Sequence, residues 1–429
     1  MRTAGFLLGV LLLPAALNAE NWPEWRGARR DGTSMEKSLP LKWSATDNVK
    51  WKAELPGPGN STPIVWENQI FITQASEDGT KRNLLSFDRT TGRKNWEKGT
   101  TYPAREQSHE TNPQCSSSPA TDGERVIAWF GSAGVFCYDL TGKELWKRDL
   151  GKHEHEWGYA ASPVIHGDLV YLNFGPGPQS FLVALNKKTG DEVWRYDIEE
   201  KHYKERKDGF AGQNTGITGS WSTPIVVKAD GREDLVMTVG DKMVGLDPKT
   251  GKETWFCRGL NPLIYTSPVF GEGLIVANGG FHGPDMAVRP GGKGDVTETH
   301  KVWEGGRTAN RLGSAVIKDG YMFLPTMPGM AECIDLKTGK TVWNERIRGA
   351  GAKSDTWTSM VLAGDRIYVV NQSADTIVLK ASPQFEILQV NSVGPEMCNS
   401  SIAASNGDIF IRTHKNLWCI SNTSTQAAK

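Results

Sequence analysis

The feature that most constrains the fold of this chain is a short repeated phrase, Asp-x-x-Thr-Gly-x-x-x-Trp. It stands at residues 88–96, 247–255 and 335–343, with Asn in place of Asp at 186–194 and one residue fewer at 139–146. The Asp can accept hydrogen bonds from backbone N–H groups ahead of it, and the Gly can take the left-handed conformation that closes a tight hairpin. The Trp then falls on the next strand. The phrase therefore predicts a β-hairpin that recurs along the chain.

The spacing of these tryptophans predicts the architecture. Two further tryptophans stand in phase without the Thr-Gly, and the seven are separated by 45, 50, 48, 61, 48 and 40 residues (Trp51, Trp96, Trp146, Trp194, Trp255, Trp303, Trp343). A period in the forties is typical of the four-stranded blades of a β-propeller. We expect the five tryptophans of the complete phrase to be structural, largely buried and packed flat against the neighbouring blade: Trp96, Trp146, Trp194, Trp255 and Trp343.

A second marker gives the number of blades. Ser or Thr precedes Pro at 62–63, 118–119, 162–163, 223–224 and 267–268, and three degenerate copies keep the Ser at 314, 359 and 401. An apolar stretch follows each marker, so we expect it to begin the innermost strand of a blade, where Pro is tolerated. Eight markers predict an all-β, eight-bladed propeller of four-stranded antiparallel blades, a single domain over residues 20–429. Residues 49–52, around the orphan Trp51, should close the ring by pairing with the C-terminal strands near 412–420.

The first 19 residues have the pattern of a secretory signal. Arg2 precedes an apolar run at 4–17, and Ala19 is a small residue suited to cleavage. An uncleaved anchor is the alternative, although Pro14 interrupts the run. We expect a periplasmic or secreted protein with no transmembrane anchor after cleavage. The 49 basic and 49 acidic residues balance, which gives no reason to expect a nucleic acid as partner.

The repeated phrase resembles the tryptophan-docking motif of the PQQ-like, or quinoprotein-type, β-propellers, and the similarity extends over nearly the whole chain after residue 19. Three groups share that motif: PQQ-dependent alcohol and glucose dehydrogenases, the BamB-like propellers of outer-membrane assembly, and exported planctomycete-type PQQ-repeat proteins of unassigned activity. The segments Asn-Trp-Pro-Glu-Trp-Arg-Gly at 21–27, Gly-Phe-His-Gly-Pro at 280–284 and Arg-Pro-Gly-Gly at 289–292 resemble the third group most.

The resemblance has different implications for each group. The dehydrogenases imply PQQ, a Ca²⁺ ion held by Glu, Asn and Asp, and often a vicinal disulfide, but this chain has no Cys-Cys pair and lacks long insertions. We therefore expect a binding scaffold for a ligand or a protein, rather than an enzyme, and no cofactor. A PQQ- and calcium-dependent dehydrogenase of alcohols or sugars, and an outer-membrane protein assembly factor, are the alternatives.

The candidate site is the mouth of the central channel on the face opposite the Thr-Gly turns, because interblade and mid-blade loops meet there. Aromatic residues recur three positions before the Pro of the marker, and polar residues follow in the same loops. The residues expected to bind a ligand are Glu110, Asn112, Trp157, Trp221, His282, Arg311, Trp357 and His414. Such a mouth suits an acidic or sugar-like small molecule, a glycan or an extended peptide, with an envelope protein as a further partner. Alternatively, the aromatic rings wedge between blades.

The cysteines and one pair of histidines leave questions open. Cys137, Cys333 and Cys419 share a slot that is small in other repeats, which indicates a buried apolar role. Cys115 and Cys398 share another slot and would meet only across a narrow channel. His153 and His155 have a spacing that suits two metal ligands, but no third ligand is identifiable, and a polar loop is the alternative.

Overall fold

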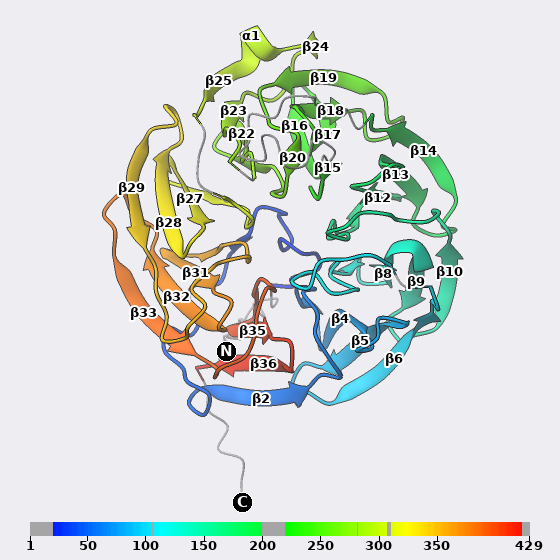
Figure 1. The fold of residues 1–429 in the computed structure, drawn as a ribbon, viewed down its shortest axis with the longest axis vertical. Coiled ribbons are helices and arrows are strands. Elements are labelled where there is room, and N and C mark those ends of the chain that lie inside the picture. Colours follow the sequence, from blue (N-terminus) through cyan, green and yellow to red (C-terminus); the bar gives the residue numbers. More distant parts are fainter. Residues whose placement is uncertain (1–19, 105, 200–218, 281, 307–309, 423–429) are drawn as a thin grey trace, which may run out of the picture.

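The chain folds into a ring of eight four-stranded antiparallel sheets around a central axis (Figure 1), which confirms the eight-bladed propeller. The computed structural model describes residues 20–104, 106–199, 219–280, 282–306 and 310–422. The expected signal segment, 1–19, lies outside them. Within these ranges, no helix has both the length and the apolar character needed to cross a membrane.

The first four blades follow one another along the chain, each running from the axis to the rim. Blade one is β3 (Ile64–Trp66), β4 (Gln69–Ala75), β5 (Lys81–Asp88) and β6 (Lys94–Thr101). Blade two is β7 (Ala120–Thr121), β8 (Arg125–Trp129), β9 (Val135–Asp139) and β10 (Glu144–Arg148), with the short helix η1 (Gly131–Ala133) between β8 and β9. Blade three is β11 (Val164–His166), β12 (Leu169–Phe174), β13 (Phe181–Asn186) and β14 (Glu192–Asp197). Blade four is β16 (Ile225–Ala229), β17 (Arg232–Val239), β18 (Lys242–Leu246) and β19 (Glu253–Arg258).

The other four blades complete the ring. Blade five is β21 (Val269–Gly271), β22 (Leu274–Ala277), β23 (Met286–Val288) and β25 (Lys301–Glu304). Blade six is β26 (Val316–Lys318), β27 (Tyr321–Thr326), β28 (Met330–Asp335) and β29 (Thr341–Arg346). Blade seven is β30 (Val361–Ala363), β31 (Arg366–Val370), β32 (Asp375–Lys380) and β33 (Ile387–Ser392), with β1 (Thr33–Ser34) parallel to β30. Blade eight is β34 (Ala403–Ser405), β35 (Asp408–Arg412), β36 (Asn416–Ser421) and β2 (Val49–Glu54).

The ring closes between the two ends of the chain, as the orphan Trp51 predicted. Strand β2 is antiparallel to β36, with Trp51 opposite Cys419 and Glu54 opposite Asn416. An N-terminal segment thus supplies the outermost strand of the last blade. Closure of this kind leaves no blade with an unpaired interface.

The docking of tryptophan on glycine explains the repeated phrase. The ring of Trp194 lies over the turn of the next blade, so close that a Cβ on Gly251 would meet it at 2.5 Å, and its Nε1 donates a hydrogen bond to the carbonyl of Pro248 at 2.9 Å. The turn glycine has a φ of +70°, which favours a residue without a side chain. The same arrangement joins Trp51 to Gly92, Trp96 to Gly142, Trp146 to Gly190 and Trp303 to Gly339.

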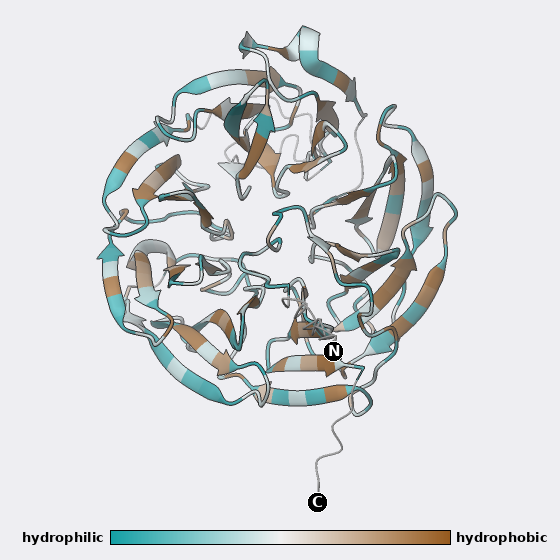
Figure 2. Ribbon diagram, turned by 180° about the vertical axis from the view of Figure 1, so that it is seen from behind, coloured by the Kyte–Doolittle hydropathy of each residue, from teal (hydrophilic) through white to brown (hydrophobic). Residues whose placement is uncertain are grey.

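These contacts account for the burial of Trp146 and Trp194, and Trp343 makes a similar one, with its Nε1 donating to the carbonyl of Ser382 at 3.2 Å. Trp146, Trp194, Trp255 and Trp343 are between 0 and 9% exposed, and Trp96 is half-buried. The outermost strands are banded in hydrophilic and hydrophobic residues (Figure 2), because one face of each packs on the next blade and the other meets solvent.

Trp255 departs from the expected docking. Its Nε1 donates to Asp234 within its own blade at 2.9 Å, and its ring lies against Gly245 rather than against a turn of blade five. Blade five has no Thr-Gly turn. Its third and fourth strands are instead joined by a longer connection that contains β24 (Gly294–Asp295), parallel to β19, and the one-turn helix α1 (Thr297–His300). The expectation that Trp255 packs flat against the neighbouring blade is therefore corrected: the turn that would receive it has been replaced.

Candidate functional site

In the segment that precedes each inner strand, two side chains point toward the axis, because side chains alternate along an extended backbone. The residue directly before the Pro position forms what we call the hydroxyl ring: Thr62, Ser118, Ser162, Thr223, Ser267, Ser314, Ser359 and Ser401. The residue two positions earlier forms the mouth ring: Asn60, Ser116, Ala160, Trp221, Tyr265, Leu312, Trp357 and Asn399. Each blade thus contributes one residue to each ring.

The hydroxyl ring ties consecutive blades together. The backbone N–H of Thr62 donates to Ser118 Oγ at 2.8 Å, and the same bond is repeated at 2.8–3.1 Å at each following junction as far as the bond from Ser359 to Ser401. At the last junction, Ser400 Oγ donates to the carbonyl of Ser61 at 3.1 Å. These bonds explain why the second marker keeps Ser or Thr even where its Pro is lost.

A cavity of about 450 Å³ lies above the hydroxyl ring, and we call it the axial cup. All eight residues of the mouth ring line it, together with six of the hydroxyl ring. Its volume falls in the range of about 300–1,000 Å³ that is usual for small-molecule sites. The remaining lining residues are Trp25, His109, Thr111, Asn112, Trp157, Asn310 and Met327.

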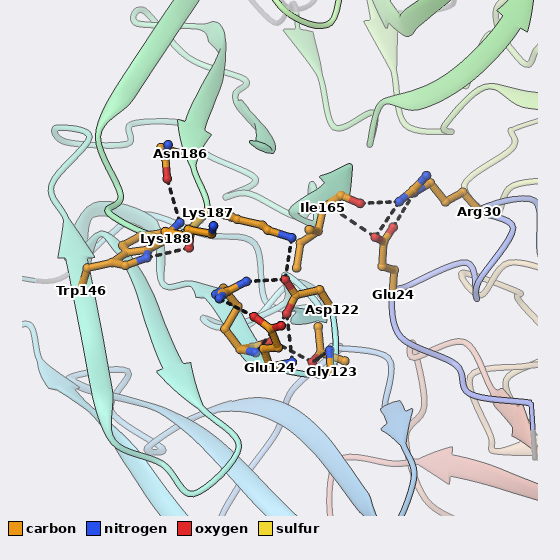
Figure 3. Close-up of polar contacts among 12 residues, drawn as sticks. Glu24, Arg30, Asp122, Gly123, Glu124, Trp146, Ile165, Asn186, Lys187 and Lys188 are labelled. Atoms are coloured by element: carbon orange, nitrogen blue, oxygen red, sulfur yellow. Dashed lines mark hydrogen bonds and ion pairs between the residues drawn. The ribbon is translucent and has the colours of Figure 1, made fainter. Parts of the chain in front are cut away.

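An N-terminal segment, residues 21–32, closes the cup from below. It crosses the middle of the ring (Figure 1) and places Trp25 in the lining. Glu24 accepts the backbone N–H of Ile165 and pairs with Arg30 at 2.7 Å, and Arg30 also donates to the carbonyl of Ile165 (Figure 3). Buried Arg26 donates to the carbonyls of Met360 at 2.7 Å and of Ala315. The segment is thereby fastened to blades three, six and seven, and the channel becomes a cup with a floor.

Three rings from consecutive interblade loops form what we call the aromatic wall: Trp157, Trp221 and Tyr265. The rings of Trp157 and Trp221 are nearly parallel, with centroids 6.0 Å apart and an interplanar angle of 25°. Tyr265 lies 5.1 Å from Trp221. Trp221 Nε1 donates to the carbonyl of Gly158 at 2.9 Å, which fixes the orientation of its ring.

The opposite part of the mouth is polar. The side-chain amides of Asn60 and Asn399 both donate to the carbonyl of Thr111, at 2.9 and 3.1 Å. Asn112 donates to the carbonyl of Trp157 at 2.7 Å and so joins the polar side to the aromatic wall. These amides are therefore held in place before any ligand arrives.

The lining of the cup, as far as the described residues form it, contains no Asp, Glu, Lys or Arg. His109 is the single histidine among the described lining residues. The described part of the lining is accordingly uncharged, with aromatic rings on one side and amides and hydroxyls on the other.

Of the eight residues expected to bind a ligand, the structure places four in the lining: Asn112, Trp157, Trp221 and Trp357. Arg311 is not among them. It is 2% exposed and is paired with Asp285 at 2.6 Å and with Glu332. Arg311 stands one residue before Leu312 of the mouth ring, and a shift of one residue along an extended chain turns the side chain to the opposite side. The adjacent slot therefore faces the space between blades.

The remaining three expected residues also lie outside the lining. Glu110 is exposed on the loop whose neighbours Thr111 and Asn112 enter the cup. His282 is half-buried in the loop between β22 and β23. His414 lies behind the mouth ring, with Nε2 3.3 Å from Asn60 Oδ1. Burial, together with the nearby Arg412 and Lys353, lowers the pKa of His414 to about 4, so its ring is neutral at pH 7.

The histidine pair and the cysteines have ordinary packing roles. His153 is 3% exposed and packs edge-on against Trp129 at 6.0 Å, whereas His155 packs edge-on against Trp221 at 5.0 Å. No cluster of three or more metal-ligating side chains occurs among the described residues. All six cysteines are buried free thiols, Cys115 and Cys398 included, and burial raises the pKa of both of these to about 12.

Sequence reasoning missed several lining residues. Asn60, Leu312 and Asn399 occupy the same register as Trp221 and Trp357, so a comparison of all eight markers at that position would have found them. Trp25 comes from the segment outside the repeats, and no spacing signal links it to the channel.

Comparison with known proteins gives one family and two kinds of relative. The family model described as "Outer membrane protein assembly factor BamB" matches residues 41–177 and 178–428. A quinohemoprotein alcohol dehydrogenase, ADH IIB, of Pseudomonas putida is 23% identical over 51% of this chain, which spans only 33% of the dehydrogenase. The assembly factor BamB of Burkholderia pseudomallei is 23% identical over 59% of this chain and 71% of its own length. The crystal structure of BamB from Moraxella catarrhalis shares the fold with a TM-score of 0.58, at 14% identity over 86% of this chain and 98% of that one.

Proposed function

The chain belongs to the PQQ-repeat propeller family described as outer membrane protein assembly factor BamB, and within it we propose that this protein is an exported binding protein whose axial cup holds an uncharged ligand. It acts as a scaffold rather than as a catalyst. The ligand sits on the channel axis, above the hydroxyl ring and against the aromatic wall.

The observation behind this proposal is the neutral, floored cup itself. Its aromatic and amide side chains converge from all eight blades, and several are held in place by hydrogen bonds to neighbouring loops. Pre-formed concave sites with a few oriented polar groups are typical of small-molecule binding. A charged ligand would find no described side chain of opposite charge in the lining, and burial of an unpaired charge is costly.

A dehydrogenase that uses PQQ and calcium fits this lining poorly. PQQ has several carboxylates, which call for Arg or Lys, and Ca²⁺ is held by oxygen ligands that usually include carboxylates. The described lining offers neither kind of side chain. The described lining therefore does not favour a site for PQQ and Ca²⁺.

The family description favours one second candidate, a role in outer-membrane protein assembly. In that role the ligand of the cup would be a segment of another envelope protein. The two candidates share the site and differ in the chemical nature of the occupant.

Calorimetric titration of the purified protein tests the proposal. The panel holds uncharged oligosaccharides, capped uncharged peptides and uncharged aromatic alcohols, each beside an acidic or basic counterpart. A cup-filling variant, Leu312→Trp, should abolish binding of an uncharged compound, because the larger side chain takes up space in the cup. The fold should tolerate the change, since Trp already occupies this register in blades four and seven. Met35→Trp, at a side chain that is 69% exposed, is the control.

Binding of an uncharged compound that Leu312→Trp removes and Met35→Trp preserves is the expected result. Binding only of charged compounds, or binding that survives Leu312→Trp, would overturn the proposal. Dye-linked alcohol oxidation on addition of PQQ and Ca²⁺ would support the dehydrogenase instead.

A further inference from the structure

The mouth ring is divided into two continuous arcs. From blade three to blade seven its residues are apolar or aromatic: Ala160, Trp221, Tyr265, Leu312 and Trp357. From blade eight to blade two they are polar: Asn399, Asn60 and Ser116. The residues at this one register position thus give the cup an apolar side and a hydrogen-bonding side. The ligand should accordingly have one apolar face and one edge of hydrogen-bonding groups.

The aromatic wall offers a broad surface for a flat apolar face. Trp157, Trp221 and Tyr265 contact one another with centroid distances of 5.1–6.1 Å and interplanar angles of 25–44°, so their rings form one cluster in which Trp221 is the most buried. Trp157 and Tyr265 are half-buried and keep part of their rings in the cup. The C–H face of a sugar ring suits such a patch, because aromatic side chains supply rigid apolar area at low entropic cost.

The polar arc offers donors and acceptors in fixed positions. Asn60 and Asn399 each donate one amide N–H to the carbonyl of Thr111, and a side-chain amide has two N–H donors. Gln372 Nε2 donates to Asn399 Oδ1 at 3.0 Å, which fixes the direction of that amide. Neutral His414 supports Asn60 from behind. The second N–H of each amide is available to a hydroxyl group.

Two other uncharged classes fit less well. A purely apolar ligand would cover the amides and ring hydroxyls without pairing them, which costs about 1–3 kcal/mol for each buried polar group. An extended peptide binds best to a strand edge with free N–H groups. Here the N–H groups of the hydroxyl-ring residues, just before the inner strands, are already bonded to the next hydroxyl of the ring, as between Thr223 and Ser267.

We infer that the axial cup recognises an uncharged carbohydrate, with the C–H face of one sugar ring on Trp157, Trp221 and Tyr265 and its hydroxyl groups toward Asn60 and Asn399. This inference rests on the proposed function and narrows it to one class of ligand. The side chains at the mouth-ring position then determine which sugar is bound, because they set which edge of the sugar faces an amide group.

The test uses neutral hexasaccharides of glucose, xylose and mannose as probes, with capped uncharged peptides and a uronic-acid oligosaccharide beside them. Affinity is measured by calorimetry, and contact is measured by saturation-transfer NMR. Trp157→Ala and Asn399→Ala should each weaken binding of a neutral hexasaccharide at least tenfold. Trp66→Ala, which removes a half-buried Trp near the opposite face, is the matched control and should leave the affinity unchanged.

The outcomes separate the inference from the proposed function. Binding of a capped peptide in the cup, with no saccharide bound at millimolar concentration, overturns the inference and leaves the proposed function standing. Binding of no uncharged compound at all overturns both. Binding of a hexasaccharide that Trp157→Ala leaves unchanged also overturns the inference, because the sugar then lies elsewhere. Far-UV circular dichroism shows that each variant is folded.

Discussion

Replacing Gly251 by Ala tests whether tryptophan docking holds neighbouring blades together. A Cβ at this position would lie 2.5 Å from Cε3 of Trp194, where carbon atoms at rest stand about 3.5–4.0 Å apart. The indole ring must therefore move by roughly 1 Å. That movement stretches its 2.9 Å hydrogen bond to the carbonyl of Pro248.

The structure provides a control for the backbone cost. Gly231 lies in the same blade with a φ of +73°, against +70° for Gly251, and a Cβ there would meet nothing within 4 Å. Gly231→Ala should thus cost only the left-handed conformation, about 1–2 kcal/mol. Gly251→Ala adds overpacking of about 1–3 kcal/mol and a weakened hydrogen bond of about 1 kcal/mol. We expect a total of about 3–6 kcal/mol.

The assay is the free energy of unfolding from urea titration, followed by far-UV circular dichroism. A double-mutant cycle completes it: in a Trp194→Ala background, Gly251→Ala should fall to the cost of Gly231→Ala, because no ring remains to be displaced. Equal costs for the two glycine variants in the wild-type background would refute the docking argument. A penalty at Gly251 that persists without Trp194 would refute it equally.

Three further predictions concern the ring bonds, the pH dependence and the floor of the cup. Ser267→Ala leaves the N–H of Thr223 unpaired in a buried position and should lower the free energy of unfolding by about 1–3 kcal/mol, whereas Ser267→Thr should retain most of it. The pKa of His414 is lowered to about 4 in the fold from an ordinary 6.5, so the unfolded chain takes up a proton first as pH falls. The contribution of His414 to the free energy of unfolding should be fully present above pH 6.5 and should decline toward pH 4 by up to about 1.4 kcal/mol per pH unit. His414→Gln should flatten that decline in urea titrations at several pH values. Arg26→Ala leaves the carbonyls that the guanidinium now bonds without a partner; a loss of about 2 kcal/mol or more is expected, and an unchanged unfolding midpoint would show that the floor is not fastened there.

Much of the fold followed from the sequence because its signals are local. The Asp-to-Trp phrase encodes a turn and a docking ring within nine residues, and its period gives the blade. Closure of the ring was predictable because Trp51 had a phase but no preceding strands. Trp255 was different, since its partner depends on a turn in blade five that the sequence has lost, and only the tertiary arrangement shows the replacement by Asp234.

The candidate site was only partly predictable. Trp221 and Trp357 followed from their register, whereas Arg311, at the adjacent position, was expected at the mouth but is paired with Asp285 outside the lining. The direction of a side chain at a strand's first residues depends on where extended structure begins, and loop residues give no periodicity to fix that point. Trp25 lies more than thirty residues before Asn60, the next lining residue along the chain, and the segment that carries Trp25 is held by bonds to three distant blades.

The most direct test of the account is a crystal structure of the protein with the neutral oligosaccharide that binds most tightly in solution. We expect one sugar ring against the aromatic wall, with hydroxyl groups within hydrogen-bond distance of Asn60 and Asn399 and the chain end above Trp25. A ligand bound on the outer strands or on the face of the Thr-Gly turns, with the axial cup free of it, would contradict the central claim.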